Sequence, residues 1–241
     1  MIGRGTKLCP GLLDGKDKKE FFIFDFCGNF DFFRINKGRE SASTMALQGA
    51  IFQLNFEMAH KLQEPDFQTD ELKEYRGKLV EYMVGKVNEL NRDNFAVKQH
   101  LKYVDKYSEK INYEIISFPD TVEVKEELSP LIEPDNDNPK ALRFDALIYG
   151  IELAQLTGEK HTKALRDLKK KVRDLSRISN VPDVMKQTDL INKILTSDYI
   201  EAAGISDFED IRKRLRDLIK YIPIDKLRYD TNFDDEILCI N

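Results

Sequence analysis

Residues 141–151 read Ala-Leu-Arg-Phe-Asp-Ala-Leu-Ile-Tyr-Gly-Ile, and their pattern is the strongest indication of the fold class. In a helix, these residues would place apolar side chains on nearly every side. A helix at a protein surface keeps its apolar residues to one stripe. We therefore expect residues 141–151 to form a central helix that other elements surround.

On both sides of that segment, apolar residues recur at spacings of three and four, the period of an amphipathic helix. Thr69 is predicted to cap one helix, and Ser206, with Glu209 three residues later, to begin another through a capping box. The fold class expected for residues 41–222 is therefore mainly α, with about seven helices. The stripes on which this rests cover residues 47–62, 72–90, 97–104, 165–178 and 211–222.

Residues 119–140 interrupt this pattern. Between Asp120 and Asp137 the chain holds seven acidic residues against one lysine, and three prolines lie in or beside that segment. Acidic runs broken by proline are typical of exposed loops. We predict an acidic loop at about 119–140 that separates two helical halves.

The same loop contains a pattern that resembles a nuclease metal site. Asp120, Glu123 and Lys125 match the two carboxylates and the lysine that surround Mg²⁺ in many nucleases. In an extended segment, Asp120 and Glu123 would point to opposite faces and could not share one ion. We therefore interpret these residues as part of a surface loop and expect no metal site.

The first 38 residues have a different composition. The run Glu-Phe-Phe-Ile-Phe-Asp-Phe at residues 20–26 is short, dense and aromatic, and glycines lie on both sides of it. Such a run predicts a strand buried on both faces, which needs neighbouring strands. Few other strand candidates follow, so we expect the chain to start partway through a larger domain.

Composition excludes several classes of protein. The 241-residue chain is 41% hydrophobic and 34% charged, and its formal net charge of −5 argues against a uniformly basic DNA-coating protein. No apolar run reaches the ~18 residues of a membrane span, and no secretory signal opens the chain. The three cysteines form no C-x-x-C pair. This usage favours a reducing cytoplasm, and no metal site is expected from the cysteines or histidines.

Residues 3–7, Gly-Arg-Gly-Thr-Lys, resemble motif VI of superfamily 2 helicases, whose arginines contact the γ-phosphate of ATP. The resemblance implies that Gly3 and Arg4 bind the nucleotide in a complete motor and that Arg4 senses its γ-phosphate. Lys7 stands where the family has its arginine finger. A lysine keeps the charge but lacks the bidentate fork of a guanidinium.

A wider resemblance is to the C-terminal part of type I restriction enzyme R subunits of the EcoEI type. It implies that residues 1–38 end the second RecA-like helicase lobe and that residues 41–241 form the helical C-terminal domain. The segments that carry the resemblance are residues 3–10, 22–30, 143–149, 211–222 and 229–236.

The function implied by this resemblance is that of a type I site-specific deoxyribonuclease. The intact protein would use ATP and Mg²⁺ to translocate double-stranded DNA and then cleave it. The helical domain would dock this motor onto the modification and specificity subunits. The sequence lacks a phosphate-binding G-x-x-x-x-G-K-[ST] loop, so we expect the chain alone to be inactive and to need no cofactor.

A different function remains open, that of a helical accessory domain by which a standalone superfamily 2 helicase contacts DNA. Its basis is a basic face predicted within residues 160–186, which suits phosphate contacts without base recognition. The candidate contacts are Lys169, Lys170, Arg173 and Arg177. A third hypothesis is that the chain is an unrelated helical scaffold. It requires the resemblance of the first thirty residues to be a coincidence.

Overall fold

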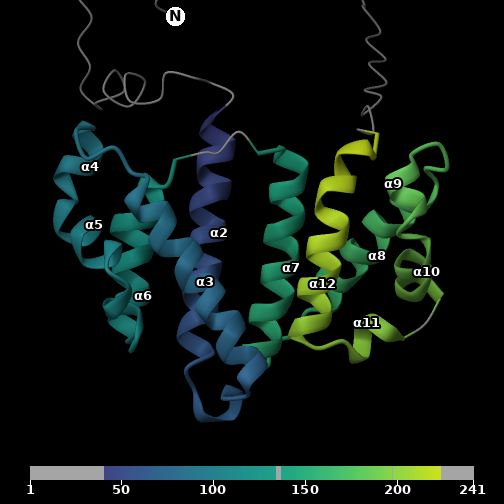
Figure 1. Ribbon diagram of the computed structural model, residues 1–241, viewed down its shortest axis with the longest axis horizontal. Coiled ribbons are helices and arrows are strands. Elements are labelled where there is room, and N and C mark those ends of the chain that lie inside the picture. Colours follow the sequence, from purple (N-terminus) through teal and green to yellow (C-terminus); the bar gives the residue numbers. More distant parts are fainter. Residues whose placement is uncertain (1–40, 134–136, 197, 224–241) are drawn as a thin grey trace, which may run out of the picture. The chain divides into compact units, whose positions relative to one another are not determined.

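The computed structural model describes residues 41–133, 137–196 and 198–223 (Figure 1). The chain divides into two compact units, residues 1–42 and 43–241, and nearly all described residues belong to the second. Every regular element in these ranges is helical, which confirms the mainly α prediction. The expected helicase-lobe remnant at residues 1–38 lies outside the described residues. Among the described helices, none is both long and apolar enough to cross a membrane.

The first of two hydrophobic cores forms around α2 (Ser41–Lys61) and α3 (Asp70–Asn88). At its centre, the rings of Phe56, Tyr107 and Tyr113 meet edge to face, with centroids 5.5, 5.8 and 5.9 Å apart. Edge-to-face packing is a favoured geometry for buried aromatic rings. Smaller elements complete this half: η2 (Pro65–Phe67), α4 (Phe95–Gln99), α5 (Leu101–Ser108), η3 (Lys110–Tyr113), α6 (Phe118–Glu123), η4 (Val124–Leu128) and η5 (Ser129–Leu131).

The second core belongs to the C-terminal half and includes the fully buried Leu168, Phe208 and Leu215. Helix α8 has its apolar residues on one side and its charged residues on the other, so it covers this core from the surface. The elements of this half are α7 (Pro139–Thr157), α8 (Thr162–Ser176), α9 (Pro182–Met185), α10 (Thr188–Thr196), α11 (Tyr199–Ala202), α12 (Ile205–Leu215) and η6 (Arg216–Tyr221).

Helix α7 belongs to both cores, as its sequence predicts. Leu142 and Tyr149 pack into the first core, whereas Phe144 and Ile148 pack into the second. Figure 1 shows α7 between α2 on one side and α12 on the other. The apolar residues on several sides of α7 are therefore needed because it has neighbours on several sides.

The acidic loop predicted at 119–140 is wrong over most of its length. Residues 118–131 form α6, the π-helical turn η4 and the 3₁₀ turn η5. Val124, Leu128, Leu131 and Ile132 are buried in the first core. These positions are spaced by four, three and one, a helical pattern that the many acidic residues between them obscured.

The helices α2 to α12 outnumber the roughly seven predicted because some apolar stripes are broken. The stripe at 97–104 is divided between α4 and α5 at His100, whose φ of −116° and ψ of 17° are not helical. The stripe at 211–222 passes from α12 into the tighter helix η6 at Arg216. Apolar spacing alone does not reveal such breaks, since it continues across them.

Helix starts were predicted with mixed success. The side chain of Thr69 accepts a hydrogen bond from the backbone N–H of Leu72 at 3.3 Å, so the predicted cap of α3 is confirmed. The cap of α12 is Gly204 rather than Ser206. The carboxylate of Asp207 accepts the Gly204 N–H at 3.0 Å, which moves the start of the helix two residues toward the N-terminus.

Gly49 marks a close approach between α2 and η5. A Cβ atom at this position would lie 2.4 Å from the backbone carbonyl oxygen of Ser129. No real side chain tolerates that distance, so only glycine allows the two backbones to pack this closely.

Candidate functional site

The four cations predicted to contact DNA all lie on α8, but the structure separates their surroundings. Lys169 pairs with Glu201 of α11 at 3.2 Å, and Arg177 pairs with Asp174 at 3.3 Å. Arg173 is exposed, and Lys170 lines a cleft next to α8. Of the four, only Lys170 lines this cleft. Gly3, Arg4 and Lys7, the predicted nucleotide contacts, lie outside the described residues.

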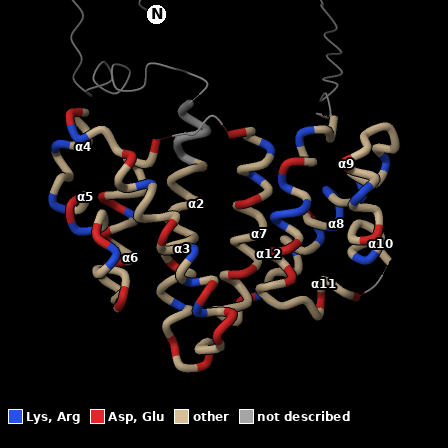
Figure 2. The backbone as a smooth tube through the Cα atoms, viewed as in Figure 1, with Lys and Arg blue, Asp and Glu red and all other residues tan. Residues whose placement is uncertain are grey.

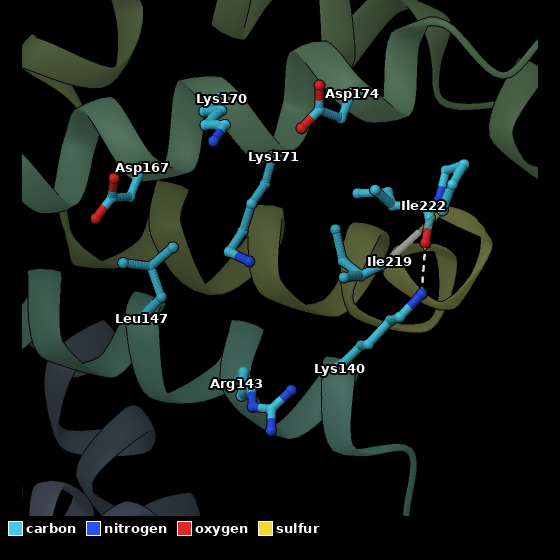
Figure 3. A pocket seen from close by; sticks show the side chains of 10 residues that line it. Lys140, Arg143, Leu147, Asp167, Lys170, Lys171, Asp174, Ile219 and Ile222 are labelled. Atoms are coloured by element: carbon cyan, nitrogen blue, oxygen red, sulfur yellow. Dashed lines mark hydrogen bonds between the residues drawn. The ribbon is translucent and has the colours of Figure 1, made fainter. Parts of the chain in front are cut away.

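The cleft that includes Lys170 lies between α7, α8 and the end of η6 and has a volume of about 470 Å³ (Figure 3). We call it the basic cleft because four cations line it against two carboxylates. Three of its residues, Leu147, Ile219 and Ile222, give it an apolar wall. Its charged lining residues are Lys140, Arg143, Asp167, Lys170, Lys171 and Asp174.

Three of the four cations in the basic cleft have no partner among the residues that the structure describes. The ammonium of Lys140 donates to the backbone carbonyl of Ile222 and, at 3.3 Å, to that of Lys220. The side chains of Arg143, Lys170 and Lys171 form no hydrogen bond or ion pair with the described residues. In Figure 3, Lys171 extends from α8 across the cleft toward α7, the helix that carries Arg143. Local like charge of this kind attracts anions.

Sequence reasoning found Lys170 but missed Lys140, Arg143 and Lys171 as members of one site. Two of the three, Lys140 and Arg143, come from α7 and lie about thirty residues before Lys170 and Lys171 in the chain. The basic composition of α8 was visible, whereas the contribution of α7 depends on how the two helices pack.

A second cluster of charges lies on the other side of α7, where it meets α12 and η6. The carboxylate of Asp145 accepts hydrogen bonds from Arg212 at 3.1 Å and from Arg216 at 2.9 Å. Arg212 also binds Glu209 through two nitrogens, at 2.7 and 2.9 Å, and Arg216 binds Asp137 at 2.6 Å. We call these five residues the junction network. All its charges are paired, so its role is to join helices.

The electrostatics of the junction network agree with that role. Burial opposes ionisation of Glu209, but the hydrogen bond and positive charge of Arg212 outweigh it and lower the Glu209 pKa. Burial likewise opposes the charged form of Arg212, whereas Glu209, Tyr149 and Asp145 raise its pKa overall. The ring of Tyr149 lies 5.0 Å from the Arg212 guanidinium and covers it.

Beside the junction network lies a buried carboxyl group without a cation. Glu152 of α7 is fully buried, and its Oε2 accepts a hydrogen bond of 2.5 Å from the Tyr75 hydroxyl of α3. Its other oxygen, Oε1, has no hydrogen-bond partner in the described part of the chain. Burial raises the pKa of Glu152 to about 8, against the opposing effect of the Tyr75 hydrogen bond. The folded chain therefore favours the protonated form of this carboxyl.

Large apolar side chains are exposed along a short segment of the first half. Ile111 lies on η3, Ile115 follows it, and Phe118 and Val122 lie one turn apart on α6. Their exposed fractions are 62%, 84%, 71% and 39%. These four residues lie close together in the sequence, within positions 111–122, and we call them the apolar surface. Clusters of exposed large apolar residues are typical of protein interfaces.

The nuclease-like pattern at Asp120 and Glu123 has a different geometry from the one expected. The segment is helical, so both carboxylates lie on one face and accept hydrogen bonds from the Lys106 ammonium, at 2.7 and 2.8 Å. Partial burial opposes ionisation of Asp120, but hydrogen bonds from Lys106 and Ser117 lower its pKa to about 2. Lys106 thus occupies the place that a cation would take. No group of metal ligands occurs among the described residues.

Comparison of the chain with protein-family models, with curated proteins and with solved structures finds no match. The resemblance to type I restriction R subunits therefore remains a prediction from the quoted residues.

Proposed function

We propose that residues 43–223 belong to the helical domain that docks a type I restriction R subunit onto its modification and specificity subunits. The proposal rests on the resemblance of residues 3–10, 22–30, 143–149, 211–222 and 229–236 to that family. The observation that carries it in the structure is the apolar surface on η3 and α6.

The apolar surface has the character of an interface centre. Side chains that are 62–84% exposed, such as Ile111, Phe118 and Ile115, gain stability when a partner removes them from water, at about 25 cal/mol per Å². Stable interfaces combine such a centre with a polar rim. Here Glu109 and Glu114 are exposed beside it, and neither forms an ion pair with a described residue.

This arrangement defines the chemistry of the partner. Its contact surface should be apolar at the centre and should carry lysine or arginine around the rim, opposite Glu109 and Glu114. Complementary charges of this kind increase the rate of association and fix the orientation of the complex. DNA does not fit this surface, because its phosphates would be repelled by the same two glutamates.

The catalytic part of the proposal concerns the intact protein. There, Gly3 and Arg4 would bind ATP with Mg²⁺, and Lys7 would stand at the arginine-finger position. The proposed role of the helical domain is attachment, so the chain alone is expected to show neither ATPase nor nuclease activity.

Binding to the purified modification–specificity complex tests the docking role. The 241-residue chain, immobilised for biolayer interferometry, should bind that complex at physiological salt. The variant Ile115→Asp/Phe118→Asp should bind at least ~10-fold more weakly, because two desolvated apolar anchors are each worth ~1 kcal/mol or more.

The matched control is Phe95→Asp, which changes a phenylalanine on α4 that is 65% exposed but lies outside the apolar surface. It should bind like the unmodified chain. Equal binding by all three proteins would show that docking, if present, uses another surface. No binding by the unmodified chain would contradict the docking function itself.

One observation favours the alternative, a helical accessory domain that contacts DNA. It is the basic cleft, with three cations that lack a partner among the described residues. Tight DNA binding with no binding to the modification–specificity complex would favour this second function.

A further inference from the structure

The basic cleft gathers four positive charges from two helices and has only two carboxylates in its lining. Arg143 and Lys140 come from α7, and Lys170 and Lys171 come from α8. Bringing like charges together is unfavourable, by about 1 kcal/mol for a pair 4 Å apart in water and by more near a protein surface. The junction network shows that this chain pairs its arginines closely elsewhere. Such an arrangement is stable only if water or an anion balances the charge.

The two acidic residues of the basic cleft do not supply that balance. Asp174 is engaged by Arg177, which lies outside the lining of the cleft. Asp167 is exposed and forms no ion pair with a described residue. The cleft therefore keeps an excess of positive charge.

The cleft also fixes the position of one of its cations and places an apolar wall beside it. Backbone carbonyls of Lys220 and Ile222 hold the Lys140 ammonium at one end, so its position is fixed before any ligand arrives. Ile219 is almost fully buried and forms part of the apolar wall beside it. An apolar wall lowers the local dielectric constant and strengthens the attraction between the cations and an anion.

Arg143 determines which anion fits best. A guanidinium is planar, always charged and able to donate two parallel hydrogen bonds, which matches the oxygens of a phosphate group. Lys170 and Lys171 add point charges from the opposite wall. A volume of about 470 Å³ admits a phosphate group together with part of the molecule that carries it.

We propose that the basic cleft binds a phosphate group, with Arg143 and Lys171 as its main contacts and Lys140 and Lys170 as supporting charges. The phosphodiester backbone of DNA and the phosphates of a free nucleotide share this chemistry. The proposal is independent of the docking function, because the cleft and the apolar surface have no residue in common.

The proposal also changes the predicted set of phosphate contacts. Of Lys169, Lys170, Arg173 and Arg177, only Lys170 lines the basic cleft. Lys169 and Arg177 already have carboxylate partners. Arg173 is exposed on α8 and is not part of the lining.

The test measures binding of the 241-residue chain to a short fluorescein-labelled DNA duplex by anisotropy. It also measures binding to ATP and to inorganic phosphate by titration calorimetry. The variant is Arg143→Ala/Lys171→Ala. The control is Arg166→Ala/Arg173→Ala, which removes the same charge from exposed positions of α8 outside the cleft. Thermal melting of both variants checks that they are folded.

If the duplex is the source of the phosphate, the cleft variant should bind it ~10-fold more weakly and the control should change little. The slope of log K against log salt, measured at about 0.05–0.2 M, should fall by about one for each phosphate contact removed. If a free nucleotide is the source, ATP binding should depend on the cleft and duplex binding should not.

Two results would overturn the proposal. Equal weakening of duplex binding by both variants would show that only the total positive charge of the chain matters, and not its place in the basic cleft. Failure of the folded, unmodified chain to bind the duplex, ATP or inorganic phosphate would show that the cations are simply hydrated. Arg143→Lys gives a further check, since it keeps the charge and should lose part of the affinity if the guanidinium binds phosphate through two nitrogens.

Discussion

Helix α7 contributes charged residues to two clusters, the junction network and the basic cleft. Both are rich in charged residues in the sequence, but among the described residues only the first has all its charges paired. On one side, Asp145 receives Arg212 and Arg216 in the junction network, where each charge has a partner. On the other side, Arg143, only two residues earlier, lines the basic cleft without a partner among the described residues. Figure 2 shows positive and negative residues close together along these helices. The number of charges therefore does not separate a structural site from a binding site, whereas their pairing does.

This difference has a physical basis. A buried cation is stable only when hydrogen bonds and an opposite charge replace its water. The side chains of Asp145, Arg212 and Arg216 are 6%, 15% and 22% exposed, so they depend on one another. The cations of the basic cleft keep access to solvent and can exchange water for a ligand. We expect mutations in the first group to change stability and mutations in the second to change binding.

The largest effect should come from Asp145→Ala. It leaves Arg212 and Arg216 largely buried without their shared carboxylate, and breaking such a pair typically costs ~3–5 kcal/mol. Urea denaturation of the 241-residue chain should show this loss as a lower midpoint.

The matched control for Asp145→Ala is Asp167→Ala, the unpaired carboxylate of the basic cleft. Exposed substitutions usually stay within about ±0.5 kcal/mol, and we expect that range here. If both variants lost a similar free energy of unfolding, the pairing of charges would not explain the difference between the junction network and the basic cleft.

Glu152 provides a second, somewhat smaller effect, because it is a buried acid that has a tyrosine instead of a cation. Its pKa is raised from 4.5 in its ordinary state to about 8 in the folded chain. The folded state therefore favours the protonated form. The stability that this group contributes is complete below about pH 4.5, falls as the pH rises toward 8, and does not change further above it.

Glu152→Gln removes this dependence while keeping the shape and one hydrogen-bonding oxygen. The unfolding free energy of the unmodified chain, relative to this variant, should fall by a few kcal/mol between pH 5 and 8, since each pKa unit corresponds to about 1.4 kcal/mol. Urea titrations at several pH values measure it. Parallel pH profiles for the two proteins would mean that Glu152 ionises without penalty.

Sequence reasoning reached the fold more easily than the sites. The apolar residues of 141–151 predict a central helix, and α7 confirms it by packing into both cores. The helix at 118–131 was missed because acidic residues dominate its composition, although Val124, Leu128 and Leu131 follow a helical spacing. Periodicity of the buried positions was the better signal there.

The sites were harder to predict because they combine distant segments. Asp145 and Arg216 are 71 residues apart in the chain, and only the packing of η6 against α7 brings them together. The same holds for Arg143 and Lys171 in the basic cleft. A sequence shows which residues are charged. Which of those charges form pairs depends on how helices that are distant in the sequence pack against each other.

The smallest effect we expect comes from Lys171→Met, which tests directly whether a cation of the basic cleft stabilises the fold. Methionine keeps a similar length and removes one of the unpaired charges that line the basic cleft. The loss of local repulsion should stabilise the unligated chain by about 0.3–0.5 kcal/mol at low salt. The gain should shrink as salt rises, because the Debye length falls to about 3 Å at 1 M. Thermal melts at low and high salt measure the difference. Removing a cation that serves binding stabilises the unligated chain and weakens ligand binding. Removing a cation that serves the fold destabilises the chain. Destabilisation by more than about 1 kcal/mol would therefore place Lys171 with the residues of the junction network.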